Sequence, residues 1–179
     1  MTGSARGIRL GAVVGGMILT LGAASHAGTL VREEPGTPVA DATPEAVGRY
    51  LVVLGGCNDC HTPGWAESNG ELAEAGWLTG APVGFRGPWG TSYPANLRLT
   101  AQKLSEDGWV ARLQAGAGLP PMPWMNVRQM KEEDMRAVYR FIRSLGPAGT
   151  PAPMPVAPGV EPTTPYIPFE PVFPAGAGS

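Results

Sequence analysis

The sequence predicts a small helical domain with long irregular loops, and three observations support this prediction. Three segments combine a helix-start signal, either a capping residue or acids in the first turn, with apolar side chains at helical spacing. Glycine, proline and tryptophan are concentrated between these segments. The end of the chain holds 10 of its 20 prolines, too many for a helix or a core. We therefore expect a helical domain over residues 43–146 and an extended, proline-rich tail over residues 147–179, either lying on the domain or free.

The first two expected helices have recognisable ends. The first begins at Pro44, after the capping hydroxyl of Thr43, and we expect it to end near Leu54. The second follows the cap Ser105 and ends at a glycine-rich stretch that begins with Gly116. Their apolar side chains are better explained by packing than by function.

The last expected helix spans residues 132–145 and has the clearest pattern. Three acids occupy its first turn, and Gly146 with Pro147 ends it. Its apolar residues recur at the spacing of one helical face: Met135, Val138, Tyr139, Ile142 and Leu145. This stripe is expected to cross the first helix.

The N-terminal region has the composition of an export signal. Residues 1–27 are interpreted as a signal peptide, because two arginines precede an apolar run at residues 10–24 that is short for a membrane span. Small residues at Ser25 and Ala27 predict cleavage after Ala27; the alternative is an uncleaved anchor. Residues 28–42 lack periodicity and are expected to form a linker. No later segment is apolar enough to cross a membrane.

The net charge narrows the classes of partner. The chain carries 13 Lys and Arg against 15 Asp and Glu. Without Arg6 and Arg9 of the expected leader, 11 basic residues remain, so the exported chain has a formal charge of −4. This balance argues against nucleic acid or an anionic membrane surface as a partner and is compatible with a basic patch on a protein.

The motif around which the chain is organised is C-x-x-C-H, formed by Cys57, Cys60 and His61. This pattern indicates attachment of a c-type haem. Two thiols three positions apart can each add across one vinyl group of the same porphyrin, and the adjacent imidazole can bind the iron as proximal ligand. No other cysteine exists, and the second histidine, His26, lies in the expected leader. Attachment of this kind takes place outside the cytoplasm, which agrees with export to a periplasm.

Three other interpretations of these residues stay open. The cysteine pair is also found in thioredoxin-like redox motifs, although those require a βαβ context. The pair could belong to a zinc site, but two cysteines and one usable histidine are one ligand short of a closed structural site. Finally, the two cysteines could form a plain disulfide in an oxidising compartment.

A second informative stretch is Leu-Pro-Pro-Met-Pro-Trp-Met-Asn, residues 119–126. A thioether ligand has to approach the iron from the face opposite His61, and a loop stiffened by prolines can hold a methionine for that purpose. Met122, between two prolines, is the candidate for this distal ligand, and Met125 is the rival on the same loop. Methionine is more commonly a flexible core residue, but this loop is neither periodic nor apolar at its end.

The long segment of residues 62–103 is rich in glycine and aromatic residues and is expected to wrap the edge of a porphyrin. Within it, Trp89, Asn96 and Arg98 are candidate donors to the haem propionates. The competing interpretation is ordinary loop packing for the tryptophan and a solvated surface charge for the arginine.

Taken together, three features resemble the class I cytochrome c domain over residues 43–146. They are the C-x-x-C-H motif, the methionine-containing stretch of residues 119–126, and the last helix, which begins with acidic residues. More narrowly, the chain is similar to the bacterial monohaem cytochromes c that accompany periplasmic dehydrogenases. The resemblance implies an all-α fold around one covalent haem c, with His61 and Met122 as axial ligands and no enzyme active site. It implies outer-sphere electron transfer with a redox protein, which can be a dehydrogenase, an oxidase or another cytochrome. This chain has one C-x-x-C-H motif, whereas related subunits often have several. The resemblance therefore does not identify which redox protein is the partner.

Two other functions compete with that of a single-haem electron carrier. One is a gas-binding or sensing haem protein with an open distal site, although no distal histidine is present to stabilise bound oxygen. The other is an electron-transfer subunit held permanently by an oxidoreductase, with the proline-rich tail as its docking arm.

Overall fold

The first helix begins where the sequence supplies a cap. The computed structural model of the chain describes residues 42–174. Helix α1 (Pro44–Leu54) starts after Thr43, whose Oγ1 accepts a hydrogen bond of 3.2 Å from the N–H of Ala46. Pro44 occupies the first turn, where its missing N–H is not needed. The predicted bounds of this helix are confirmed. The expected signal peptide lies outside the described residues, as does the linker up to residue 41.

The two other predicted helices are also present. In α4 (Glu106–Ala115) the Ser105 Oγ accepts the Gly108 N–H at 3.1 Å, and Gly116 ends the helix with a φ of +54°. Helix α6 (Glu132–Ser144) ends one residue before the predicted terminus. Strong local signals of capping, periodicity and glycine termination therefore located all three helices.

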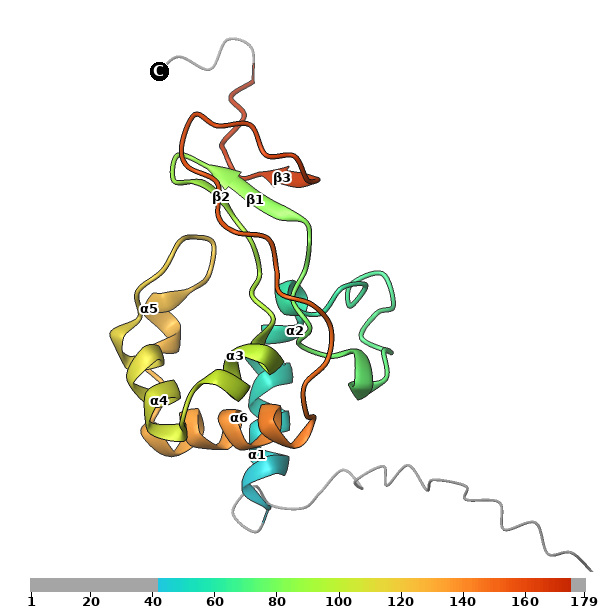
Figure 1. The fold of residues 1–179 in the computed structure, drawn as a ribbon, viewed down its shortest axis with the longest axis vertical. Coiled ribbons are helices and arrows are strands. Elements are labelled where there is room, and N and C mark those ends of the chain that lie inside the picture. Colours follow the sequence, from blue (N-terminus) through green and yellow to red (C-terminus); the bar gives the residue numbers. More distant parts are fainter. Residues whose placement is uncertain (1–41, 175–179) are drawn as a thin grey trace, which may run out of the picture. The chain divides into compact units, whose positions relative to one another are not determined.

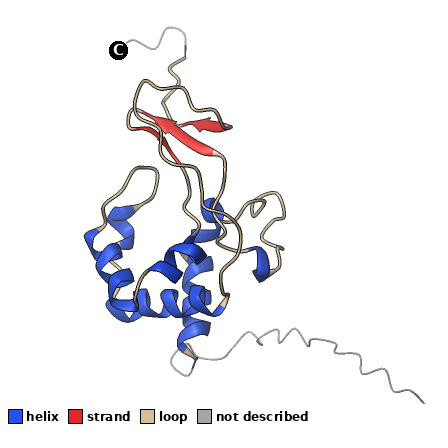
Figure 2. Cartoon of the chain, in the orientation of Figure 1, coloured by secondary structure: helices blue, strands red, loops and turns tan. Residues whose placement is uncertain are grey.

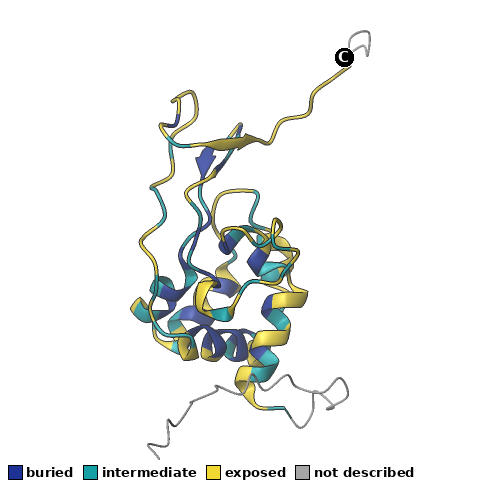
Figure 3. Cartoon of the chain, turned by 90° about the vertical axis from the view of Figure 1, so that its right-hand side faces the viewer, coloured by how far each residue is buried: buried dark blue, intermediate teal, exposed yellow. Residues whose placement is uncertain are grey.

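The three helices share one apolar core, in which α6 is central (Figure 1). Helix α1 crosses α6 at Gly48, where an added Cβ would lie 2.0 Å from the carbonyl oxygen of Ala137. Only glycine permits so close an approach of the two backbones. Figure 3 shows buried residues in the helices and also in β2, all three residues of which are buried. The buried core consists of Val52, Trp77, Leu78, Ala101, Trp109, Val110, Leu113, Met135, Val138, Tyr139, Phe141 and Ile142.

Several short elements were not predicted from the sequence. Helix α2 (Cys57–His61) contains the C-x-x-C-H motif, α3 (Leu97–Lys103) follows the long loop, and α5 (Trp124–Val127) follows the methionine loop. A 3₁₀ turn, η2 (Glu74–Gly76), lies within the long loop. Elements this short contain too few turns for a helical period to be recognised.

A small sheet is a further difference from the predicted all-α class. Its strands are β1 (Gly84–Gly87), β2 (Gly90–Ser92) and β3 (Tyr166–Pro168), in the order β2-β1-β3. Strand β1 pairs antiparallel with β2 and parallel with β3, and Figure 2 shows the strands apart from the helices. The strands are too short for an alternating pattern, and β3 comes from a part of the chain distant from β1.

The proline-rich tail lies on the rest of the described chain. It belongs to the same structural unit as the helices. Val156 pairs with Thr91 through backbone hydrogen bonds of 2.8 and 2.9 Å, and the hydroxyls of Tyr93 and Thr164 are 2.6 Å apart. Of the two arrangements left open by the sequence, the structure therefore has the tail packed on the domain as far as residue 169.

Candidate functional site

The C-x-x-C-H motif forms a single turn of helix directly after α1. Gly55 ends α1, and Gly56 has a φ of +67°, a left-handed conformation that suits glycine and turns the chain into α2. Cys57 and Cys60 are both free thiols of intermediate burial, three positions apart in this turn. The two sulfur atoms are thus available on one short, well-defined element.

The surroundings of the thiols argue against the three other interpretations of the motif. The two cysteines do not form a disulfide, and no group of three His, Cys, Asp or Glu side chains within residues 42–174 is arranged to hold a metal ion. Burial raises the pKa of the Cys57 thiol to about 11, and burial together with Asp59 raises the pKa of Cys60. Without a bound metal, burial therefore favours the neutral form of both thiols. The element before Cys57 is a helix, not the strand of a thioredoxin-like unit.

His61 is held in one orientation by a backbone carbonyl. Its ring is 8% exposed, and its Nδ1 lies 2.7 Å from the carbonyl oxygen of Ala95. Because a carbonyl only accepts hydrogen bonds, Nδ1 carries the proton and Nε2 keeps its lone pair. Burial lowers the pKa of His61, which favours the neutral imidazole. A neutral imidazole with a fixed tautomer is the form that binds a metal.

A second set of hydrogen bonds fixes the backbone around His61. The Gly80 N–H donates to the His61 carbonyl oxygen at 2.8 Å. Gly80 has a φ of +76°, and an added Cβ would lie 2.6 Å from the backbone nitrogen of Asn96. The segment that holds the His61 backbone is therefore packed directly on the segment that provides the Ala95 carbonyl. Neighbouring Thr62 donates from Oγ1 to Asn58 Oδ1 at 2.7 Å and accepts the Leu78 N–H at 2.8 Å.

Two of the three candidate propionate donors have other partners. Arg98 is buried and donates to the carbonyl oxygens of Ala75, Leu145 and Gly146, so it ties the end of α6 to η2. The Asn96 amide donates to two tail carbonyls, at 2.8 and 3.1 Å, while its oxygen caps α3. Because Arg98 is buried, the alternative interpretation of its side chain as a solvated surface charge is also contradicted. Trp89 stays a candidate, because its Nε1 is buried and has no partner within the described residues.

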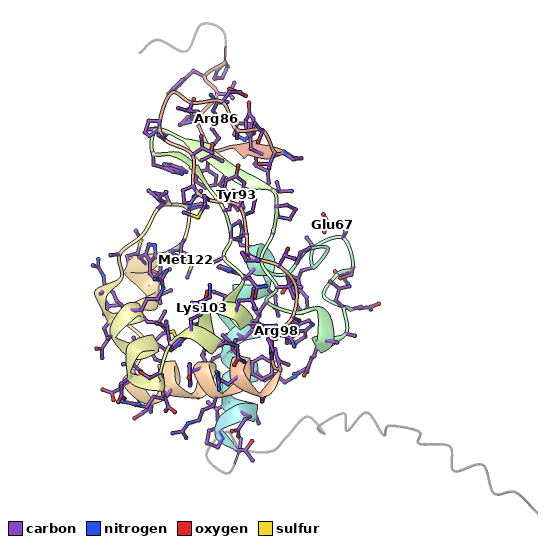
Figure 4. All side chains as sticks on the ribbon, in the orientation of Figure 1. Glu67, Arg86, Tyr93, Arg98, Lys103 and Met122 are labelled. Carbon is purple, nitrogen blue, oxygen red and sulfur yellow. The ribbon has the colours of Figure 1, made fainter. Side chains whose placement is uncertain are left out.

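The methionine loop, residues 116–123, joins α4 to α5 and contains Met122, which Figure 4 labels. Met122 has intermediate burial, whereas Met125 is 65% exposed. Both residues line a hollow of about 430 Å³, which is bordered by residues 116–128 and by Phe169. Neither thiol nor His61 lines this hollow. The structure thus brings the cysteines and the histidine together on α2 and places Met122 on a separate loop and Met125 in α5.

Sequence reasoning missed the groups that orient the site. The Ala95 carbonyl has no sequence signature, since every residue carries one. Gly80 belongs to the segment of residues 62–103, which is recognisable from the sequence only as rich in glycine and aromatic residues. Phe169, on the tail, was not connected with the methionine loop. Of these, only the glycine could have been suspected from its residue type.

Comparisons with protein-family models, with curated proteins and with solved structures found no match to the chain. Within residues 42–174, the structure contains no helix that is both long and apolar enough to traverse a lipid bilayer. The expected apolar leader lies outside this range.

Proposed function

We propose that the chain is a single-haem c-type cytochrome that carries electrons in the periplasm. Cys57 and Cys60 would attach the haem covalently, His61 would be the proximal ligand and Met122 the distal ligand. The proposed fold is that of the class I cytochrome c domain, to which the small sheet and the packed tail are additions. The proposal rests on the residues of this chain, not on similarity to a characterised relative.

The observation that carries the proposal is the contact between His61 Nδ1 and the Ala95 carbonyl. Within residues 42–174, Nε2 makes no hydrogen bond and is not among the fully buried polar atoms that lack a partner, so it is open to a further ligand. His61 directly follows Cys60, one of two free thiols in the same turn. An oriented imidazole beside a thiol pair is the donor set that a covalent haem requires.

When bound, haem supplies a one-electron couple between ferrous and ferric iron. The residues of this chain would hold that group and control its surroundings. The Ala95 carbonyl orients His61 and raises its basicity, and the apolar residues around α2 exclude water. A Met/His ligand pair favours a high reduction potential. No proton transfer and no catalytic residue are needed for this role, so we infer a carrier or transfer subunit rather than an enzyme.

The inferred partner is another redox protein, such as a dehydrogenase, an oxidase or a second cytochrome. The acidic charge expected for the exported chain favours a basic docking patch on that partner. Export is inferred from the leader-like composition of residues 1–27 and from the site of haem attachment.

Absorption spectra of the exported protein, oxidised and reduced, test the proposal. Expression with intact haem-attachment machinery should give covalent haem, and the Cys57→Ser, Cys60→Ser double variant should lose it. The ferric protein should show the far-red band of sulfur-ligated iron. That band should vanish in Met122→Ala and persist in the matched control Met125→Ala. A colourless protein would refute the haem proposal.

The same preparation separates the carrier from the gas-binding alternative. A firmly held Met122 blocks the distal face, so ferrous carrier should take up carbon monoxide slowly. Rapid uptake by the unmodified protein, together with a missing far-red band, would favour an open distal site. The distal ligand would then be neither methionine, and the sensing function would replace electron transfer.

A further inference from the structure

One residue that lines the hollow beside Met122 comes from the far end of the chain. Every other residue that lines it comes from residues 116–128, the segment that contains the methionine loop. Phe169 is the exception, because it follows β3 in the proline-rich tail. An aromatic side chain from the tail therefore contacts the space next to the inferred distal ligand.

Phe169 is fixed in place by β1 and by two aromatic rings. Its N–H donates to the Arg86 carbonyl oxygen at 2.6 Å, which continues the pairing of β3 with β1. Its ring meets the ring of Phe85 edge to face, with centroids 6.4 Å apart, and that of Trp89 at 5.9 Å. Such pairs stabilise one relative orientation of the rings. Although Phe169 is half exposed, its position is thus determined by three separate contacts.

The chain just before Phe169 is attached to the same strand. The Pro165 carbonyl oxygen accepts the Gly84 N–H at 2.9 Å. The Tyr166 hydroxyl accepts a hydrogen bond of 3.0 Å from Arg86 and donates one of 2.9 Å to Glu161. We refer to residues 165–169, which these contacts hold along β1, as the strap.

The sheet also reaches the methionine loop from β2. The Ser92 hydroxyl donates to the carbonyl oxygen of Pro120, two residues before Met122. Ser92 is the register partner of Phe85 in β1, and Phe85 contacts Phe169. The loop is therefore joined to the sheet at Pro120, and Phe169 of the strap faces it across the hollow.

A thioether is a neutral and weak ligand, so its occupancy depends on how well its loop is ordered. The loop contains Gly116 and Gly118, and the segment before α5 has no regular structure to fix it. Contacts that restrict such a loop lower the entropy lost when Met122 binds. Removing them would increase the fraction of protein in which Met122 is displaced.

We propose that the strap holds the methionine loop and that Phe169 is a positioning residue for the Met122 thioether. The assignment of Met122 as a ligand rests on the proposed function, whereas the position of Phe169 across the hollow from the loop does not. The tail is thereby part of the redox centre rather than only a covering of the domain.

Binding of imidazole to the ferric protein tests the positioning role, because imidazole competes with Met122 for the iron. Phe169→Ala should bind imidazole about tenfold more tightly than wild type, since more of the protein is in the open state. Phe169→Leu keeps apolar volume at this position, so its affinity for imidazole should be close to that of wild type. The matched control is Phe173→Ala, which removes an aromatic residue that is 74% exposed and does not line the hollow. Equal affinities of wild type and Phe169→Ala would overturn the proposal.

Hydrogen exchange of residues 116–128 gives a second readout that does not need haem. Phe169→Ala should accelerate exchange in this segment several-fold and leave α1 and α6 unchanged, while Phe173→Ala should do neither. Loss of protection throughout the molecule would mean that Phe169 only stabilises the fold, which would contradict the proposal. If the protein carries no haem but the local effect is present, the electron-carrier function fails and the strap stands. If haem and the far-red band are present without the local effect, the strap fails alone.

Discussion

Two regions of this molecule are stabilised in different ways. The helical region (α1, α3, α4 and α6) has a continuous buried core. The sheet region (β1, β2 and residues 147–174) contributes none of the residues of that core, and all of β3 is exposed. Instead, its segments are joined by backbone pairing, by the hydroxyl pair of Tyr93 and Thr164, and by edge-to-face aromatic rings. Apolar burial thus dominates in one region and directional contacts dominate in the other.

This difference matters because the two inferred ligands have neighbours from different regions. His61 is held by the segments that pack on the helical core, whereas the methionine loop is bonded to Ser92 of the sheet region and shares a hollow with Phe169. Changes in the helical region should therefore affect global stability. Changes in the sheet region should affect local order and the distal ligand, with little effect on global unfolding.

The largest effect is expected at the crossing of α1 and α6. Gly48→Ala would place a methyl group 2.0 Å from the Ala137 oxygen and 2.8 Å from the Cβ of Phe141, so the helices must separate. We expect a loss of about 3 kcal/mol in the free energy of unfolding, measured by urea titration. Gly76→Ala is the matched control, because nothing lies within 4 Å of its added Cβ. Equal stability of the two variants would mean that the close helix crossing is absent in solution.

A smaller loss is expected at Arg98, which ties the end of α6 to η2. Arg98→Met keeps much of the apolar stem but leaves the carbonyl oxygens of Ala75, Leu145 and Gly146 without their donor. The free energy of unfolding should fall by about 2 kcal/mol. Arg112→Met, at an exposed position of α4, should have almost no effect. If Arg98→Met left the free energy of unfolding unchanged, water would readily replace the guanidinium as donor to these carbonyl oxygens.

A single buried hydrogen bond in the helical region should contribute less. The Tyr139 hydroxyl donates to the carbonyl oxygen of Leu104 at 2.9 Å, next to the start of α4. Tyr139→Phe removes this bond and keeps the ring that packs against Trp109. Thermal unfolding should reveal a loss of about 1 kcal/mol. An unchanged midpoint would indicate that the ring alone accounts for the contribution of this side chain.

The smallest effect is expected in the sheet region, at the exposed pair of Arg86 and Glu161. Hydrogen bonding to Arg86 lowers the pKa of Glu161, so the ionised carboxylate favours the folded tail. This contribution is present above the ordinary carboxyl pKa and is lost as the pH falls through the lowered value. Glu161→Gln should therefore speed hydrogen exchange of the strap slightly near pH 7 and have no effect in acid. A change in global unfolding would contradict the division into two regions.

The sequence by itself determined the helical region and the placement of the C-x-x-C-H residues on one turn. Capping residues, acidic first turns and terminating glycines act within a few positions of where they stand, so they locate α1, α4 and α6. The C-x-x-C-H spacing likewise places Cys57, Cys60 and His61 on one turn, because three residues make almost a full helical turn. These features need no information from distant parts of the chain.

Only the tertiary structure decided which groups orient those residues. The Ala95 carbonyl that fixes His61 is 34 positions away, and the strap that contacts the methionine loop pairs with a strand about 80 residues earlier. The carbonyls that accept from Arg98 also come from distant segments. Backbone carbonyls are the same in every residue, and short strands have no period of their own. Their roles follow from which distant segments the folded core brings together, and local patterns do not encode that choice.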